Sequence, residues 1–208
     1  MRSTPLRIAA VLICVVAALA PVSASAVAPD YDGIYPTDRY HPWCTSQEVC
    51  LTDNSNLSYY ADSADWGKLE DLDKLYLGEM LYDQFDPTNL AVSYDNSPIF
   101  SGGGETDIIY QEDSEGIDGA IGMAWCNDRV DGNGYRCDQT YVRIKGHGYY
   151  QIPGVTCHET GHVVGLLHGY NTAPELYHQD TRLGCLVTGV IPPGSLGSNN
   201  RQFINAVY

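Results

Sequence analysis

The sequence contains little positive charge. Lysine and arginine number 11 against 26 aspartate and glutamate residues, so the 208-residue chain has a formal net charge of −15 at pH 7. Negative charge repels the phosphates of nucleic acids and the headgroups of anionic membranes. We therefore expect neither nucleic acid nor a membrane surface among the partners of this protein.

Long apolar runs are also absent, except near the start of the chain. An apolar stretch over residues 8–20 follows two arginines, and residues 24–26 have the small-x-small pattern of a signal-peptide cleavage site. The stretch is too short to span a bilayer comfortably. We interpret residues 1–26 as a signal peptide and predict a secreted, extracellular protein with one domain over residues 27–208. Without those two arginines, nine basic residues face 26 acidic ones, a net charge of −17.

The sequence has no C-x-x-C pair, which makes a zinc–cysteine site a weak interpretation. Cys14 lies in the predicted signal peptide, and the six cysteines that remain are an even number, as is typical of disulfides in exported proteins. Many pairings are possible. We predict the sequential set, which is Cys44–Cys50, Cys126–Cys137 and Cys157–Cys185.

The most informative feature that is present is the stretch HETGHVVGLLH, which begins at His158 and has the spacing H-E-x-x-H-x-x-G-x-x-H. On a helix, His158 and His162 differ by about 40° in azimuth and about 6 Å in rise, so both rings can reach one metal ion. Glu159 lies about 100° round the helix, beside the metal, where a general base acting on water is needed. Three protein ligands leave a fourth position open, as in catalytic zinc sites.

His168 completes the set only if the chain turns sharply. In an unbroken helix it would lie about 15 Å along the axis from His158. Gly165 stands where the turn is needed, and glycine adopts positive φ without strain. The sequence therefore predicts a metal site formed by His158, His162 and His168.

This stretch resembles the signature of the metzincin zinc peptidases, and it looks most like secreted bacterial members of the matrixin or snapalysin type. The resemblance implies an α+β fold in which a mixed, mostly parallel sheet packs on an active-site helix, with a short C-terminal helix. It also implies one catalytic Zn²⁺ on the three histidines, Glu159 as general base and acid, and polypeptide substrates. We expect a monomeric zinc endopeptidase.

The sequence departs from the family at the turn beneath the metal. Metzincins carry a methionine there, whereas here no methionine follows Met123. The equivalent turn is expected at residues 183–189, with Leu186 in the place of the methionine and Thr188 where some members have a tyrosine. Leucine nearly conserves the volume and apolarity of methionine. The Cys157–Cys185 bridge would tie the metal-binding helix to this turn.

Two further hypotheses compete with the peptidase. A secreted binding protein could retain the zinc site with weak or no catalysis, which the missing methionine favours and the retained Glu159 opposes. A disulfide-stabilised domain without any metal is the third. The latency motif of matrixins, with cysteine in a Pro-Arg-Cys-Gly context, is absent. Cys44 is the one candidate for a latency thiol, and a structural disulfide with Cys50 is the favoured interpretation.

Hydrophobic patterning predicts the other elements. We expect a turn-rich segment over residues 27–53, packed through Tyr31, Tyr35, Tyr40 and Trp43. A helix capped by Asp65 is expected over residues 65–85. Its apolar rhythm consists of Leu69, Leu72, Leu75, Tyr76, Met80 and Tyr82. Strands are expected at residues 57–61, 90–94, 107–110, 119–126 and 140–144. Pro153 suits the first turn of the metal-binding helix, and a last helix is expected over residues 199–207.

Several other residues are weaker candidates. The oxygen-bearing side chains of the loop near residue 131 could bind Ca²⁺, although turn chemistry explains them as well; these are Asp128, Asp131, Asn133 and Asp138. Three histidines outside the motif read as solvated loop residues, and these are His41, His147 and His178. Tyr170 and Tyr177 are near the site in sequence. The wall of the substrate pocket is expected around residues 190–197.

Overall fold

The computed structural model describes residues 27–40, 44, 49–64, 67–113, 115–117, 119–145 and 153–208. Five predictions lie outside these residues. They concern the signal peptide, the cap at Asp65, the packing of Trp43, and the loop positions of His41 and His147.

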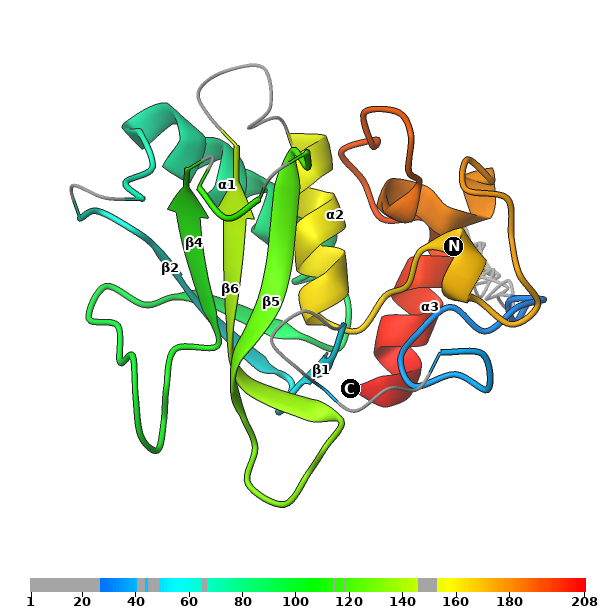
Figure 1. Cartoon of the computed structure of the whole chain (residues 1–208), viewed down its shortest axis with the longest axis horizontal. Helices are drawn as coiled ribbons and strands as arrows, with labels where there is room; N and C mark the ends of the chain where they lie inside the picture. Colours follow the sequence, from blue (N-terminus) through cyan, green and yellow to red (C-terminus); the bar gives the residue numbers. More distant parts are fainter. Residues whose placement is uncertain are drawn as a thin grey trace, which may run out of the picture.

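A six-stranded, mostly parallel sheet forms one side of the molecule (Figure 1). Its strands are β1 (Leu51–Thr52), β2 (Asn56–Ala61), β3 (Ala91–Tyr94), β4 (Ile108–Glu112), β5 (Gly122–Arg129) and β6 (Arg136–Ile144). The order β1-β6-β4-β2-β3 is parallel throughout, and β5 pairs antiparallel with β6. Buried and half-exposed residues alternate along β2, whereas β4 is buried along its whole length, as expected for a central parallel strand.

The helices complete the predicted mixed architecture. They are α1 (Asp71–Gln84), α2 (Pro153–Val163), α3 (Ser198–Val207) and the short 3₁₀ helices η1 (Gly169–Asn171) and η2 (Thr181–Leu186). α2 lies between the sheet, where it packs on β5 and β6, and the C-terminal segments, where it packs on η2 (Figure 1). The Arg201 guanidinium joins α3 to the end of α1 by donating to the backbone oxygen of Gln84 at 2.8 Å and to its side-chain oxygen at 2.9 Å.

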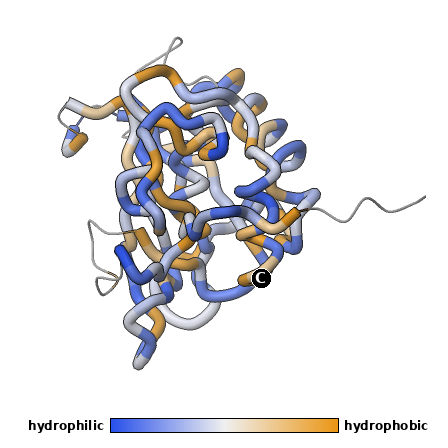
Figure 2. Tube along the Cα trace, turned by 90° about the vertical axis from the view of Figure 1, so that its right-hand side faces the viewer, coloured by the Kyte–Doolittle hydropathy of each residue, from blue (hydrophilic) through white to orange (hydrophobic). Residues whose placement is uncertain are grey.

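Apolar and polar stretches alternate along the chain trace (Figure 2). Within the described ranges, none of the helices has the length and apolarity needed to cross a membrane. One large apolar core joins the sheet to α1, α2 and the C-terminal segments. It includes Tyr31 and Tyr35, which confirms that the N-terminal segment packs onto the domain.

The first helix differs from its prediction. It begins at Asp71 and not at residue 65, because Gly67 has φ +77° and Glu70 has extended backbone. Between them the buried Leu69 donates its N–H to the Asp62 carbonyl oxygen at 3.1 Å. The buried face agrees with the predicted one only in part: Leu77, Met80 and Leu81 are buried, and Met80 alone of these three was predicted. Of the six residues of the predicted rhythm, Leu69 and Met80 are buried. The other four are 41–55% exposed, and these are Leu72, Leu75, Tyr76 and Tyr82.

The other elements lie close to their predicted positions. β5 begins at Gly122, three residues later than predicted, and ends at Arg129. Both β5 and β6 are longer than predicted on the side of the hairpin, because their pairing continues past Cys126 through irregular pairing at Asp128. The Cys126–Cys137 disulfide bridges this hairpin. β1 was not predicted, since Leu51 and Thr52 lie in a segment whose composition favours turns. This short strand exists because β6 offers it a pairing edge at Arg136 and Cys137.

Candidate metal centre

Three histidine rings converge at the end of α2. His158 and His162 lie one helical turn apart on α2, and their Nε2 atoms are 3.2 Å apart. The Nε2 atom of His168 lies 2.9 Å from each of them. The structure therefore brings together all three predicted ligands, each presenting the same ring nitrogen to a common point.

The chain reaches this arrangement through Gly165. The Leu166 N–H donates to the Gly161 carbonyl oxygen at 2.8 Å, which ends the helix, and Gly165 has φ +91° as predicted. A Cβ atom at this position would also lie only 2.6 Å from Cδ2 of Leu51. Both the backbone conformation and the close packing therefore require glycine.

Hydrogen bonds to the opposite ring nitrogens orient the histidines. Nδ1 of His158 lies 2.7 Å from the carbonyl oxygen of Cys185, and Nδ1 of His162 lies 2.8 Å from that of Leu166. Since a carbonyl can only accept, Nδ1 carries the hydrogen and Nε2 presents its lone pair. Such outer partners are usual for histidines that bind metals.

Burial keeps the rings neutral. It lowers the pKa of His158, lowers that of His162 well below its usual range, and together with the neighbouring His158 lowers the pKa of His168 to about 3. Neutral imidazoles are the form that binds metal.

The donor set fits zinc. Nitrogen ligands around a tetrahedral zinc, at about 2.0–2.1 Å from the ion, are about 3.3 Å from one another. The observed separations of 2.9–3.2 Å come close to this value. Three neutral imidazoles, two of them buried, with oriented tautomers are a typical zinc donor set.

Glu159 lies beside the three rings and is 6% exposed. Burial raises its pKa to about 8, while a hydrogen bond from the backbone of Ala124 acts in the opposite direction. A cation bound nearby would favour the ionised form and bring the pKa down again. Glu159 is therefore a carboxyl group whose proton affinity lies in the range useful for acid–base chemistry near neutral pH.

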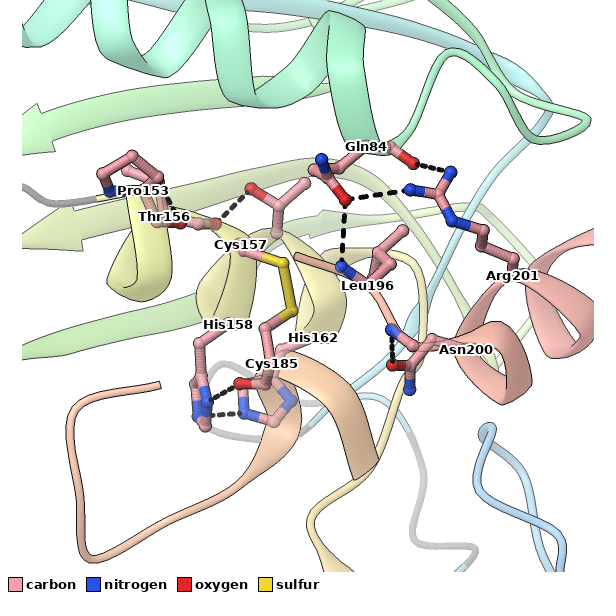
Figure 3. Close-up of a disulfide and its surroundings, with 12 residues drawn as sticks. Gln84, Pro153, Thr156, Cys157, His158, His162, Cys185, Leu196, Asn200 and Arg201 are labelled. Atoms are coloured by element: carbon pink, nitrogen blue, oxygen red, sulfur yellow. Dashed lines mark hydrogen bonds between the residues drawn. A yellow bond between two sulfur atoms is a disulfide. The ribbon is translucent and has the colours of Figure 1, made fainter. Parts of the chain in front are cut away.

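Leu186 and a disulfide lie beneath the site. A Cβ atom on Gly161 would lie 2.9 Å from Cδ2 of Leu186, which is fully buried. The turn that carries Leu186 is fixed to α2 by the Cys157–Cys185 disulfide, and the carbonyl of the same Cys185 accepts the hydrogen bond from His158 (Figure 3). The structure thus contains all three disulfides of the predicted set.

The three histidines open onto a cavity of about 750 Å³. One wall is formed by residues 119–124, at the start of β5, and the opposite wall by residues 187–192. Of residues 190–197, where the wall of the substrate pocket was predicted, the first three line this cavity. Tyr40 and Val49 also line the cavity. Sequence reasoning did not identify these two, because no pattern in the N-terminal segment indicates that it folds back over the site.

Tyr170 contacts the site and Tyr177 does not line it. The Tyr170 hydroxyl lies 2.9 Å from Nδ1 of His168, and its side chain lines the cavity. Tyr177 is 65% exposed and packs on His178. Proximity in sequence suggested both residues, and only the conformation of the chain after His168 distinguishes them.

The carboxylates of the loop considered for calcium are not among the side chains that converge as metal ligands would. Asn133 accepts the N–H of Tyr135 at 3.0 Å, and Asp128 accepts the N–H of Arg129 at 2.8 Å, as in ordinary turns. Among the described residues, two groups of side chains converge as metal ligands would: the three histidines, and Cys44 with Cys126 and Cys137. The latter sulfurs belong to disulfides, so they are not thiolate ligands.

No protein-family model matches the chain, and no curated protein matches it in sequence.

Proposed function

We propose that this protein is a secreted zinc endopeptidase of the metzincin type. The observation that carries the proposal is the convergence of three Nε2 atoms beside a buried glutamate, at the edge of an open cavity. A structural zinc site would be closed by a fourth protein ligand, and the described residues supply three. The three disulfides agree with an oxidising compartment outside the cell.

Glu159 performs the proton transfers of the proposed reaction. When zinc is bound, it supplies a Lewis acid that polarises the scissile carbonyl and acidifies water. The Glu159 carboxylate accepts a proton from the attacking water and later delivers it to the departing amide nitrogen. Its burial favours both steps, because the carboxyl group then holds a proton more readily than an exposed one.

The cavity suits an extended polypeptide. Within the described part of the chain, β5 pairs with β6 alone, so its other edge can accept a substrate strand through backbone hydrogen bonds. Residues 122–124 of β5 line the cavity beside Glu159. The apolar side chains of the opposite wall would receive a side chain of the substrate, and these are Val187, Val190, Ile191 and Pro192.

Metal analysis combined with a cleavage assay tests the proposal. The purified protein should contain about one zinc per chain and should cleave casein and members of a broad peptide library. A chelator should abolish cleavage, and added Zn²⁺ should restore it. Cleavage that persists in the zinc-free protein would contradict the proposal.

The alternative is a secreted zinc-binding protein with little or no catalytic activity. Leu186, in the place of the family methionine, is the observation that favours it. One zinc per chain in a protein that is inert towards the whole peptide library would support this alternative. Absence of zinc would instead support a disulfide-stabilised domain without metal.

A further inference from the structure

The three candidate ligands differ in what holds them. His158 and His162 donate to backbone carbonyl oxygens, and both hydrogen bonds are buried. His168 has a side-chain partner instead, because its Nδ1 atom lies 2.9 Å from the hydroxyl of Tyr170. Tyr170 is 50% exposed. The third ligand is therefore the one whose orientation depends on a single side-chain atom.

The direction of this hydrogen bond follows from the geometry of the site. Nε2 of His168 faces the other two Nε2 atoms, so a neutral ring that binds metal carries its hydrogen on Nδ1. The Tyr170 oxygen then accepts that hydrogen. The two rings also contact each other, with centroids 5.3 Å apart and planes inclined by 44°.

The backbone of Tyr170 is held in place from outside the site. Nε of Arg39 donates to the Tyr170 carbonyl oxygen at 2.7 Å, and the same guanidinium pairs with Glu175. The turn itself is closed by the Asn171 N–H, which donates to the His168 carbonyl oxygen at 2.9 Å. The hydroxyl of Tyr170 is thus presented to His168 by a supported turn and not by a free loop.

We propose that Tyr170 is a positioning residue for the third metal ligand: its hydroxyl accepts the Nδ1 hydrogen of His168 and holds the ring with Nε2 directed at the metal. This inference rests on the metal site of the proposed function. Losing an outer partner of a metal-binding histidine typically weakens metal affinity about 10–100-fold. Because solvent can replace an exposed hydroxyl in part, the lower end of this range is expected.

Tyr170→Phe tests the proposal, with Tyr177→Phe as its matched control. Both substitutions remove one phenolic hydroxyl group from an exposed tyrosine of the same C-terminal region. Tyr177, however, contacts His178, which is not one of the three candidate metal ligands. The full chain, produced in a secreting host, is loaded with Zn²⁺ to follow metal release to a chelator. It is loaded with Co²⁺ to record the visible absorption that reports ligand geometry. Thermal unfolding of the metal-free proteins detects any general loss of stability.

Tyr170→Phe should release zinc about tenfold faster than the wild type and shift the cobalt absorption, while Tyr177→Phe matches the wild type in both. The metal-free proteins should unfold alike. If both variants match the wild type in zinc release and cobalt absorption, the role of Tyr170 is disproved while the proposed function stands. A wild-type protein that takes up neither metal disproves both.

Discussion

Glu159 is the residue on which the proposed hydrolysis depends most directly. It is buried, it accepts a backbone hydrogen bond from Ala124, and it stands beside three histidines that the fold keeps neutral. Gly122 must remain without a side chain for this carboxyl group to fit, since a Cβ atom there would lie 2.6 Å from Oε1 of Glu159. The start of β5 therefore leaves room for the Glu159 carboxyl group and donates a hydrogen bond to it.

Replacing Glu159 by glutamine should abolish proteolysis without removing zinc. Glutamine keeps the volume and the acceptor oxygen but cannot exchange protons, so the rate should fall by about 10²–10⁴-fold or more. Peptide cleavage and zinc content are measured on the same preparation. Undiminished cleavage of casein by Glu159→Gln would disprove the assigned role.

Leu186 tests whether the site needs a methionine or only a well-packed apolar side chain. Leu186→Met conserves volume and should change the free energy of unfolding by less than about 1.5 kcal/mol. Leu186→Ala leaves a cavity beneath Gly161 and should cost about 2–5 kcal/mol. Denaturant unfolding of the two variants measures this difference. Equal stability would show that Leu186 does not support α2.

At the scale of elements, the exit from α2 decides whether the third histidine reaches the other two. The helix ends where Gly165 turns the chain back, the Cys157–Cys185 disulfide fixes the helix to η2, and the turn of η1 follows His168 directly. Helical periodicity positions the candidate ligands His158 and His162, whereas the turn at Gly165 positions His168. The turn should therefore be the sensitive part of the site.

Gly165→Ala should destabilise the protein and weaken zinc binding more than Gly102→Ala does. The two glycines have nearly equal φ, +91° and +89°, but a Cβ atom on Gly102 meets nothing within 4 Å. Both variants incur about 1–2 kcal/mol of backbone strain. Gly165→Ala adds the clash with Leu51, at about 1–3 kcal/mol. Thermal unfolding and zinc release measure the difference, and identical behaviour would contradict the packing argument.

At the scale of the whole molecule, the excess of acidic residues brings some carboxyl groups close to one another. Asp107 is 6% exposed and accepts hydrogen bonds from the backbone N–H of Ser58 at 2.6 Å and from its hydroxyl at 2.5 Å. Burial, and to a lesser extent the nearby carboxyl group of Asp53, raise the pKa of Asp107 to about 6. Because the pKa of Asp107 is higher in the folded than in the unfolded protein, protonation of this group increases the free energy of unfolding. This contribution is complete below about pH 4 and is lost as the pH rises through 6.

Asp53→Asn should therefore stabilise the protein at alkaline pH only. Removing the charge that faces Asp107 should raise the free energy of unfolding by about 1 kcal/mol at pH 8. At pH 4, where Asp107 is protonated, it should leave the free energy of unfolding nearly unchanged. Asp83→Asn, on the exposed side of α1, removes the same charge without this neighbour and should lack the pH dependence. Unfolding curves at both pH values compare the variants, and equal pH profiles would contradict this assignment.

The positions of the three candidate metal ligands could be predicted from the sequence because their placement depends on local geometry. Helical periodicity places His158 and His162 together, and the conformational freedom of Gly165 allows His168 to return. The strands around β2, β3 and β4 were found for a similar reason, since a strand within a parallel sheet needs an apolar run. The disulfide pairs were predicted less directly, by choosing the sequential set.

The remaining features depended on residues that are far apart in the sequence. β1 forms because its backbone pairs with the edge of β6. α1 begins late because Leu69, before it, is buried and donates its N–H to the Asp62 carbonyl oxygen. Tyr40 reaches the cavity from the N-terminal segment, and Tyr170 rather than Tyr177 meets His168. Backbone geometry acts over a few residues and can be read from spacing, whereas burial, pairing and side-chain partners arise only when distant segments pack together.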